Sequence, residues 1–321
     1  MDVSVHHMTR RRWKDAPIME RHEGFNQIEI VHPQFARAVA LLDTRMRMRK
    51  YKAAAMGFLL VCPPNGGKTS FLNYLRRRYP PVEAEDISLH PLIGFSIPNP
   101  CNPLGLSNAI LEDMGDPDAG GSGARTQIRR ANRMIEKVKV KILAVDNMQD
   151  VPERRGTKGV QIVGNFFRDV IDCNVVPVLL GTQEANVVVR SNDQLRRRVP
   201  STLSLGIYDI MTPKGLSTCL RIVDRFDDEC PLERKSSVAR TWIGKAIVYG
   251  SNGTLGGISG LFRYAMTACV DEGLELLQLR HWHTAFNQLY AGFEDYNPFV
   301  EGERKWRRLD QPGEPFFLVK S

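Results

Sequence analysis

Short apolar runs that alternate with segments of helical spacing constrain the fold of this 321-residue chain more than any other feature. Four of these runs carry almost no polar alternation, which is typical of strands covered on both faces. They occupy residues 56–61, 92–97, 140–147 and 175–183. Strands of this kind, joined by helices, form a parallel sheet flanked by helices. The sequence therefore predicts an α/β fold.

The first apolar run leads into a phosphate-binding motif, "VCPPNGGKTS" over residues 61–70, which precedes a segment of helical spacing. A glycine-bearing turn before a helix presents backbone N–H groups and the helix dipole to a phosphate. The usual pattern is G-x-x-x-x-G-K-[ST], and Cys62 stands in place of its first glycine. We expect Lys68 to reach the outer phosphates of ATP and Thr69 to hold Mg²⁺. The predicted cradle consists of Pro63, Pro64, Asn65, Gly66, Gly67, Lys68, Thr69 and Ser70.

Two later strands end in polar residues that suit the same site. Asp146 ends the third apolar run, where a Mg²⁺-orienting carboxylate of a P-loop ATPase would lie. A lone Asp at this place could also simply cap a strand-to-helix loop. Thr182 ends the fourth run and could sense the γ-phosphate. Because parallel strands end at one edge of the sheet, we expect these residues to converge with Lys68 on one crevice.

Asn147 follows Asp146, where AAA+ ATPases usually carry a glutamate that polarises the attacking water. An amide can position a water molecule but cannot accept its proton. The sequence thus supports ATP binding more strongly than fast hydrolysis.

Four regions are expected along the chain: a basic, irregular arm over residues 1–30, a nucleotide-binding core over 31–212, a helical lid over 213–289 and a tail over 290–321. The tail could dock onto a partner through aromatic anchors, or pack on the lid as a strap. Its aromatic residues among charges are Phe293, Tyr296, Phe299 and Trp306.

The formal net charge of +8 favours an anionic partner. Basic residues gather in the first 55 residues and again over 125–141, and two such clusters beside a phosphate loop suggest nucleic acid. The six cysteines include no C-x-x-C pair, so a zinc site has little support. No secretory leader or membrane span is evident, and we expect a cytoplasmic protein that does not engage a membrane.

The stretch "GTQEANVVVRSNDQLRRRV" over residues 181–199 resembles a motif of the TniB/TnsC family of AAA+ transposition regulator ATPases. "RFDDECPLERKSSVA" and "NGTLGGISGLFRYAMTACVDEGLELL" resemble further segments of that family. The resemblance spans roughly residues 30 to 285. Cys62 and Asn147 depart from the pattern of P-loop ATPases, and both bear on hydrolysis more than on binding.

The resemblance implies a P-loop AAA+ ATPase, with ATP and Mg²⁺, that forms a ring or filament on double-stranded DNA in the bacterial cytoplasm. Such proteins link a target selector (TniQ-like, in some systems with a CRISPR effector) to a transposase of the TnsB/TniA type. Arg198 matches the arginine that a neighbouring subunit donates to the γ-phosphate. The run 196–198 could instead be a solvated or DNA-facing surface. Arg263 would be a second sensor of the nucleotide.

The family also implies a DNA-binding surface between and just after the two nucleotide motifs. The residues that match it are Arg125, Arg129, Arg130, Arg154, Arg155 and Lys158. The expected catalytic set is Lys68, Asp146, Asn147, Thr182 and Arg198. Two other functions stay open: a helicase-loader ATPase, and a scaffold that holds ATP as a structural ligand without hydrolysing it.

Overall fold

The protein divides into two compact units in a computed structural model, Pro33–Leu205 and Met1–His32 together with Gly206–Ser321. The structure describes residues 10–51, 56–64, 66–83, 88–121, 123–206, 208–293, 296–301 and 305–316. The nucleotide-binding core was expected over residues 31–212, and the first unit spans Pro33–Leu205. The segment that precedes this unit, however, belongs to the second unit.

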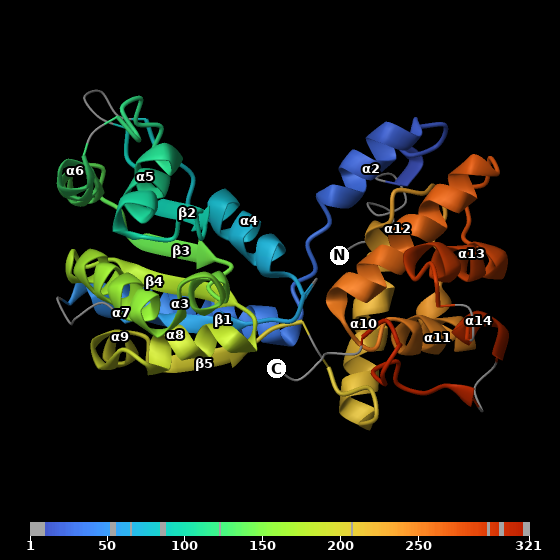
Figure 1. Ribbon diagram of the computed structural model, residues 1–321. Coiled ribbons are helices and arrows are strands. Elements are labelled where there is room, and N and C mark those ends of the chain that lie inside the picture. Colours follow the sequence, from blue (N-terminus) through green and yellow to red (C-terminus); the bar gives the residue numbers. More distant parts are fainter. Residues whose placement is uncertain are drawn as a thin grey trace. The chain divides into compact units, whose positions relative to one another are not determined.

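The first unit is built on a parallel sheet in the spatial order β2-β3-β4-β1-β5 (Figure 1). Its strands are β1 (Phe58–Val61), β2 (Leu92–Ser96), β3 (Ile142–Asp146), β4 (Val176–Gly181) and β5 (Ser201–Ser204). The four predicted apolar runs contain β1 to β4, whose residues are almost all buried. At the end of this order, β5 pairs with β1 and exposes alternate residues. Sequence patterning missed β5 because "STLS" lacks an apolar run.

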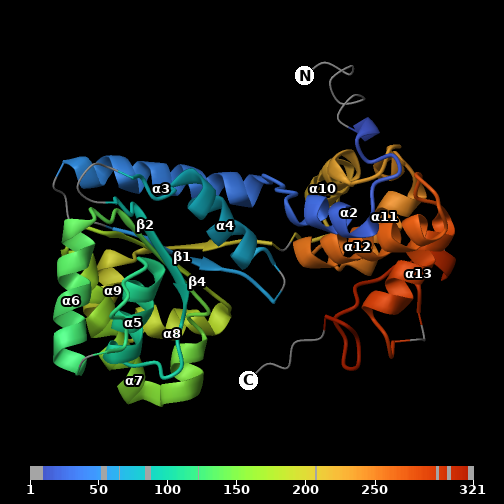
Figure 2. The same cartoon turned by 90° about the horizontal axis from the view of Figure 1, so that it is seen from above.

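Helices cover both faces of this sheet, with α3 and α4 on one face and α5 and α7 on the other (Figure 2). The bounds are α3 (Pro33–Lys50), α4 (Lys68–Arg78), α5 (Pro103–Asp113), α6 (Ala124–Lys137), α7 (Asp150–Asp172), α8 (Asn186–Arg190) and α9 (Asp193–Arg198). Side chains of both layers and of the strands form one continuous hydrophobic core. Within α7 the backbone of Gly156 is non-helical, with φ 57° and ψ −164°, so a kink divides this helix.

The second unit is helical and has its own hydrophobic core. It contains α2 (Ile18–Asn26), α10 (Pro213–Glu229), α11 (Trp242–Gly250), α12 (Leu255–Asp271), α13 (Leu279–Leu289) and α14 (Pro298–Glu301). Aromatic rings fill its centre, as in the edge-to-face pair of Phe262 and Trp282, whose centroids lie 4.8 Å apart. Within the described ranges no helix combines the length and the apolar character needed to cross a membrane.

The N-terminal segment is part of this helical unit and differs from the irregular arm that was expected. Arg21 on α2 is 2% exposed and forms a two-pronged ion pair with Glu275, including a 2.9 Å bond from Nη1 to Oε2. It also donates to the carbonyls of Ala16 and Pro231. Burial alone would raise the pKa of Glu275, but the bonds from Arg21 and the backbone N–H of Glu233 hold it below its ordinary value. A buried guanidinium with four hydrogen bonds therefore anchors α2.

The described part of the C-terminal tail packs on the same unit. Tyr296 and Phe299 are buried, and the Trp306 indole donates a 3.0 Å hydrogen bond to the carbonyl of Pro298. The ring of Trp306 also stacks on Tyr249 of α11. This arrangement is that of a strap, since two of the proposed partner anchors already fill the core.

Candidate nucleotide site

The loop after β1 and the start of α4 form the predicted cradle. Gly67 adopts φ 99°, a left-handed conformation that favours glycine, and α4 begins at the next residue, Lys68. The Lys68 ammonium turns back over the loop and donates to the carbonyls of Cys62 (3.4 Å) and Pro63 (3.2 Å). Thr69, in the first turn of α4, is exposed. Of the other predicted cradle residues, Pro63 is half-buried, Pro64 and Ser70 are exposed, and Asn65 lies outside the described residues.

Cys62 fits the position of the missing glycine for a local reason. The φ of Cys62 is not left-handed, so its backbone does not require glycine at this position. Its N–H donates to the carbonyl of Gly181 on β4, and its side chain is fully buried. Burial raises the pKa of the thiol to about 12, so it stays protonated at neutral pH. The thiol lies against Gly66, where an added Cβ would be 2.5 Å from Sγ.

The sheet brings Asp146 and Thr182 to the carboxyl ends of its strands, where this loop also begins. Val61 is the register partner of Gly181, and Val145 that of Leu179, so β1, β4 and β3 end side by side. Asp146, at the end of β3, is 5% exposed, and its Oδ1 accepts a 2.7 Å bond from the Asn147 N–H. Burial raises the pKa of this carboxyl, while the charge of Lys68 opposes the rise.

The donor set fits a divalent cation beside phosphates. A carboxylate at the end of β3 and a threonine hydroxyl at the start of α4 are the oxygen ligands that Mg²⁺ prefers. The Lys68 ammonium contacts the carbonyl of Cys62, and its charge lowers the pKa of both Asp146 and Cys62 against the effect of burial. The carboxyl ends of β1, β3 and β4 therefore lie side by side, at the end of the sheet where open α/β folds bind their ligands.

Gln149 connects two of these strand ends, a role that sequence reasoning could not assign. Its Nε2 donates to Oδ1 of Asn147 (3.2 Å), and its Oε1 accepts from the backbone N–H of Thr182 (3.2 Å). Asn147 itself is left-handed, with φ 59°. The Thr182 hydroxyl donates to the carboxylate of Glu184, and this bond lowers the pKa of Glu184. No short motif signals such a bridge, because its partners lie 33 residues apart.

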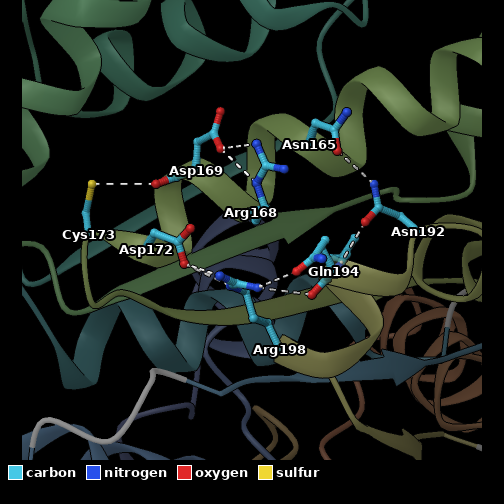
Figure 3. A network of polar contacts seen from close by, with 9 residues as sticks. Asn165, Arg168, Asp169, Asp172, Cys173, Asn192, Gln194 and Arg198 are labelled. Atoms are coloured by element: carbon cyan, nitrogen blue, oxygen red, sulfur yellow. Dashed lines mark hydrogen bonds and ion pairs between the residues drawn. The ribbon is translucent and has the colours of Figure 1, made fainter.

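Arg198 lies at the opposite end of the strands, beside the amino end of β1. Its carbonyl accepts a hydrogen bond from the N–H of Gly57, which precedes β1, whereas the cradle follows β1. Its guanidinium is bound to Asp172 at the end of α7 (Figure 3). Because about five residues of extended chain, roughly 15 Å, separate the two ends of β1, Arg198 and the cradle of the same chain do not converge.

Arg263 contacts α2 of the helical unit. Its Nη2 donates a 2.8 Å hydrogen bond to Oδ1 of Asn26, and its guanidinium lies 4.7 Å from the centre of the Phe25 ring. Partial burial lowers the pKa of this guanidinium. These contacts of Arg263 hold α2 in place.

The predicted DNA-binding arginines differ in their surroundings. On α6, Arg125 and Arg129 are exposed, whereas Arg130 donates to both oxygens of Asp116 and to Asp118. An exposed row at four-residue spacing continues beyond the predicted set and consists of Arg125, Arg129, Arg133 and Lys137. The side chains of Arg154, Arg155 and Lys158 lie outside the described residues. Helical spacing applied to this basic cluster could have separated Arg130 from the row.

Comparison with solved structures assigns the fold. The Aeropyrum pernix ORC2 protein in its ADPNP-ADP complexes matches with a TM-score of 0.60 and 12% identity, over 83% of this chain and 71% of that one. CDC6P from Pyrobaculum aerophilum matches with a TM-score of 0.58 and 13% identity, over 85% and 72%. The Aeropyrum pernix ORC1 protein in complex with DNA matches with a TM-score of 0.55 and 13% identity, over 82% and 67%. The fold is that of the AAA+ ATPases, as predicted.

The sequence comparison is more specific. The family described as "Bacterial TniB protein" matches residues 26–204, more than half of the chain. The protein belongs to the TniB family, which confirms the resemblance found in its motifs. No curated protein sequence matches the chain.

Proposed function

We propose that this protein is an ATP-switched regulator of DNA transposition, which binds ATP with Mg²⁺, oligomerises on double-stranded DNA and links a TniQ-like target selector to the transposase. One observation carries the proposal: in a chain of the TniB family, the Lys68 loop, Asp146 and Thr182 lie at adjacent strand ends. The support for the selector and the transposase as partners is membership of the TniB family.

At the proposed site each side chain has a distinct task. Mg²⁺ held by Thr69 and Asp146 would neutralise phosphate charge. Lys68 would exchange its bonds to the loop carbonyls for bonds to phosphate, since its ammonium already faces the cradle. Thr69 and Asp146 would hold the ion. Gln149 keeps the polar ends of β3 and β4 together, so a change at Thr182 can reach Asn147 through two hydrogen bonds.

Hydrolysis is proposed to be slow, because the amide of Asn147 cannot accept a proton from water. The same residue favours the second candidate, a scaffold that holds ATP without hydrolysing it. The two differ in one measurable respect: a regulator that hydrolyses ATP releases its DNA-bound assemblies over time, and that release should stop with a non-hydrolysable analogue.

The exposed row on α6 supports the proposed DNA contact. Successive members lie four residues apart, which corresponds to a rise of about 6 Å along the helix. Lysine and arginine bind phosphates irrespective of base sequence, as a protein that marks varied targets requires. Arg130 contributes less to this surface, because its guanidinium is engaged by Asp116 and Asp118.

Electron microscopy of the purified protein on duplex DNA tests the proposal, with ATP and Mg²⁺, with ADP and with no nucleotide. We expect rings or filaments with ATP only, and none for Lys68→Ala. Lys214→Ala is the matched control, because Lys214 is an exposed lysine on α10 of the other unit. Assemblies that form equally without nucleotide, or with Lys68→Ala, would remove the nucleotide switch from the proposal.

A further inference from the structure

We propose that Asp172 is a positioning residue: it holds one edge of the Arg198 guanidinium so that the other edge is presented to the nucleotide of a second copy of this chain. The inference rests on the proposed function, in which Arg198 acts on the γ-phosphate of a neighbouring subunit. It adds a residue that neither the motifs nor the family match single out.

A contact between Arg198 and a nucleotide would require a second copy of this chain. Its backbone is bonded to Gly57 at the amino end of β1, whereas Lys68 follows the carboxyl end. A side chain at that edge cannot reach a phosphate bound by its own cradle. If Arg198 contacts a nucleotide, the nucleotide belongs to another protomer.

The geometry at Arg198 leaves donors for that contact. A guanidinium has five N–H groups, and two of its nitrogens, Nε and Nη2, face Oδ1 of Asp172, with Nε at 2.9 Å. The third, Nη1, makes long contacts of 3.4 and 3.5 Å with the carbonyl and side-chain oxygens of Gln194 (Figure 3). The edge formed by Nη1 and Nη2 therefore keeps N–H groups that can turn to a planar pair of phosphate oxygens.

The element that carries Arg198 is fixed to the same helix at its other end. Asn192 caps α9 by accepting from the Leu195 N–H, and its Nδ2 donates to Oδ1 of Asn165 on α7 at 3.1 Å. Gly164 permits this approach, since an added Cβ would lie 2.8 Å from Nδ2. With Asn192 at one end and Arg198 at the other, α9 is pinned along α7. The contacts of Asn192 thus hold the backbone of α9, and Asp172 holds the guanidinium of Arg198.

The neighbouring arginines lack such support. Arg196 pairs with Asp193 of its own helix, and both side chains are more than 60% exposed, so this pair restrains little. Arg197 is exposed. The Arg198 side chain is only 23% exposed and is bound to a different helix. Pre-organisation of this kind lowers the entropy lost when a long side chain binds its target, and it distinguishes Arg198 within the run.

A mixture of two full-length variants tests the inference. The first, which donates Arg198, carries Lys68→Ala; the second, which accepts it, carries Arg198→Ala and keeps its cradle. The two are labelled for energy transfer and mixed with a fixed amount of short duplex DNA, Mg²⁺ and a non-hydrolysable ATP analogue, with ADP as the baseline. Association of this parent pair above the ADP baseline is the result expected if Arg198 acts between copies. Without it the proposed function fails, and the inference fails with it.

Asp172→Ala is then placed in either member of the pair. In the donating member we expect roughly tenfold weaker association, the loss typical of freeing one long side chain. In the accepting member we expect less than a twofold change, because Arg198 is absent there. Asp172→Asn in the donating member keeps an acceptor oxygen and should recover part of the loss. Asp169→Ala is the matched control, since Asp169 pairs with Arg168 on the same helix.

Three results would overturn the inference while leaving the parent pair intact. Equal weakening from either member would indicate a purely structural role for Asp172. Unchanged association would show that Arg198 needs no support. Tighter association with Asp172→Ala in the donating member would show that Asp172 restrains Arg198 instead of presenting it.

Discussion

The packing of the phosphate loop makes Gly66→Ala the most informative single substitution in the site. Gly66 is buried, and its φ is not left-handed, so alanine is allowed by the backbone. The obstacle is space. The new Cβ would lie 2.5 Å from Sγ of Cys62 and 2.8 Å from two ring carbons of Pro63, whereas ordinary contacts fall at 3.4–4 Å. One of these groups must move by about 1 Å.

The cost follows from how little the surroundings can yield. Cys62 is fully buried between β1 and β4, and its N–H is bonded to Gly181. Overpacking of a filled interior typically costs about 1–3 kcal/mol. If the loop moves instead, the same free energy is lost from nucleotide binding, which corresponds to a Kd increased by roughly 5- to 150-fold.

Titration with a fluorescent ATP analogue in the presence of Mg²⁺ measures the Kd, and urea unfolding of the same samples measures any loss of stability. Gly123→Ala is the matched control. Gly123 has φ −63° and nothing within 4 Å of an added Cβ, so we expect its Kd to match the unsubstituted protein.

A second substitution locates the obstacle. Cys62→Ala removes Sγ and should cost about 1 kcal/mol alone, yet combined with Gly66→Ala it should recover part of the lost affinity. Unchanged binding and stability for Gly66→Ala would refute the packing argument. If the double variant binds nucleotide no more tightly than Gly66→Ala alone, the steric clash is with Pro63 and not with Cys62.

Three further expectations concern the helical unit and the surface. Arg21→Ala leaves the partly buried carboxylate of Glu275 without its partner, and urea unfolding should show a free energy of unfolding lower by about 3 kcal/mol. The exposed Arg225→Ala should lower it by less than about 0.5 kcal/mol. Burial lowers the pKa of His32 to about 4, from 6.5 when unfolded, so acid protonates the unfolded state first. Stability should therefore fall by up to about 3 kcal/mol between pH 6.5 and 4, and His32→Gln should remove that part of the slope; parallel pH curves would contradict it. In salt titrations on duplex DNA, Arg129→Ala should reduce the slope by about 1, and Arg130→Ala should change it less.

Elements with a one-sided pattern were harder to predict than buried ones. β1 to β4 are apolar on both faces, and local patterning found them. In contrast, β5 lies at the sheet edge, and α2 has few apolar residues and is held through Arg21, whose partners Pro231 and Glu275 lie more than 200 residues away. Residues that depend on such distant partners carry no local signal.

The candidate site divides in the same way. The turn at Gly67, the position of Lys68 and the acid at the end of β3 are local features, and the sequence predicted them along with the family. Cys62 can replace a glycine here for two reasons that the sequence does not show. Its φ is not left-handed, and Gly66 leaves space for its Sγ.

The sequence by itself determined β1 to β4 and the glycine turn at the start of α4, because apolar runs and a glycine turn before a helix act over a few residues. Only the tertiary structure decided which side chains meet. It joined Gln149 to Thr182, separated Arg198 from its own cradle, engaged Arg130 with acids and bound Arg198 to Asp172. Strand order and helix packing set these distances, and neither is encoded in any one stretch of the chain.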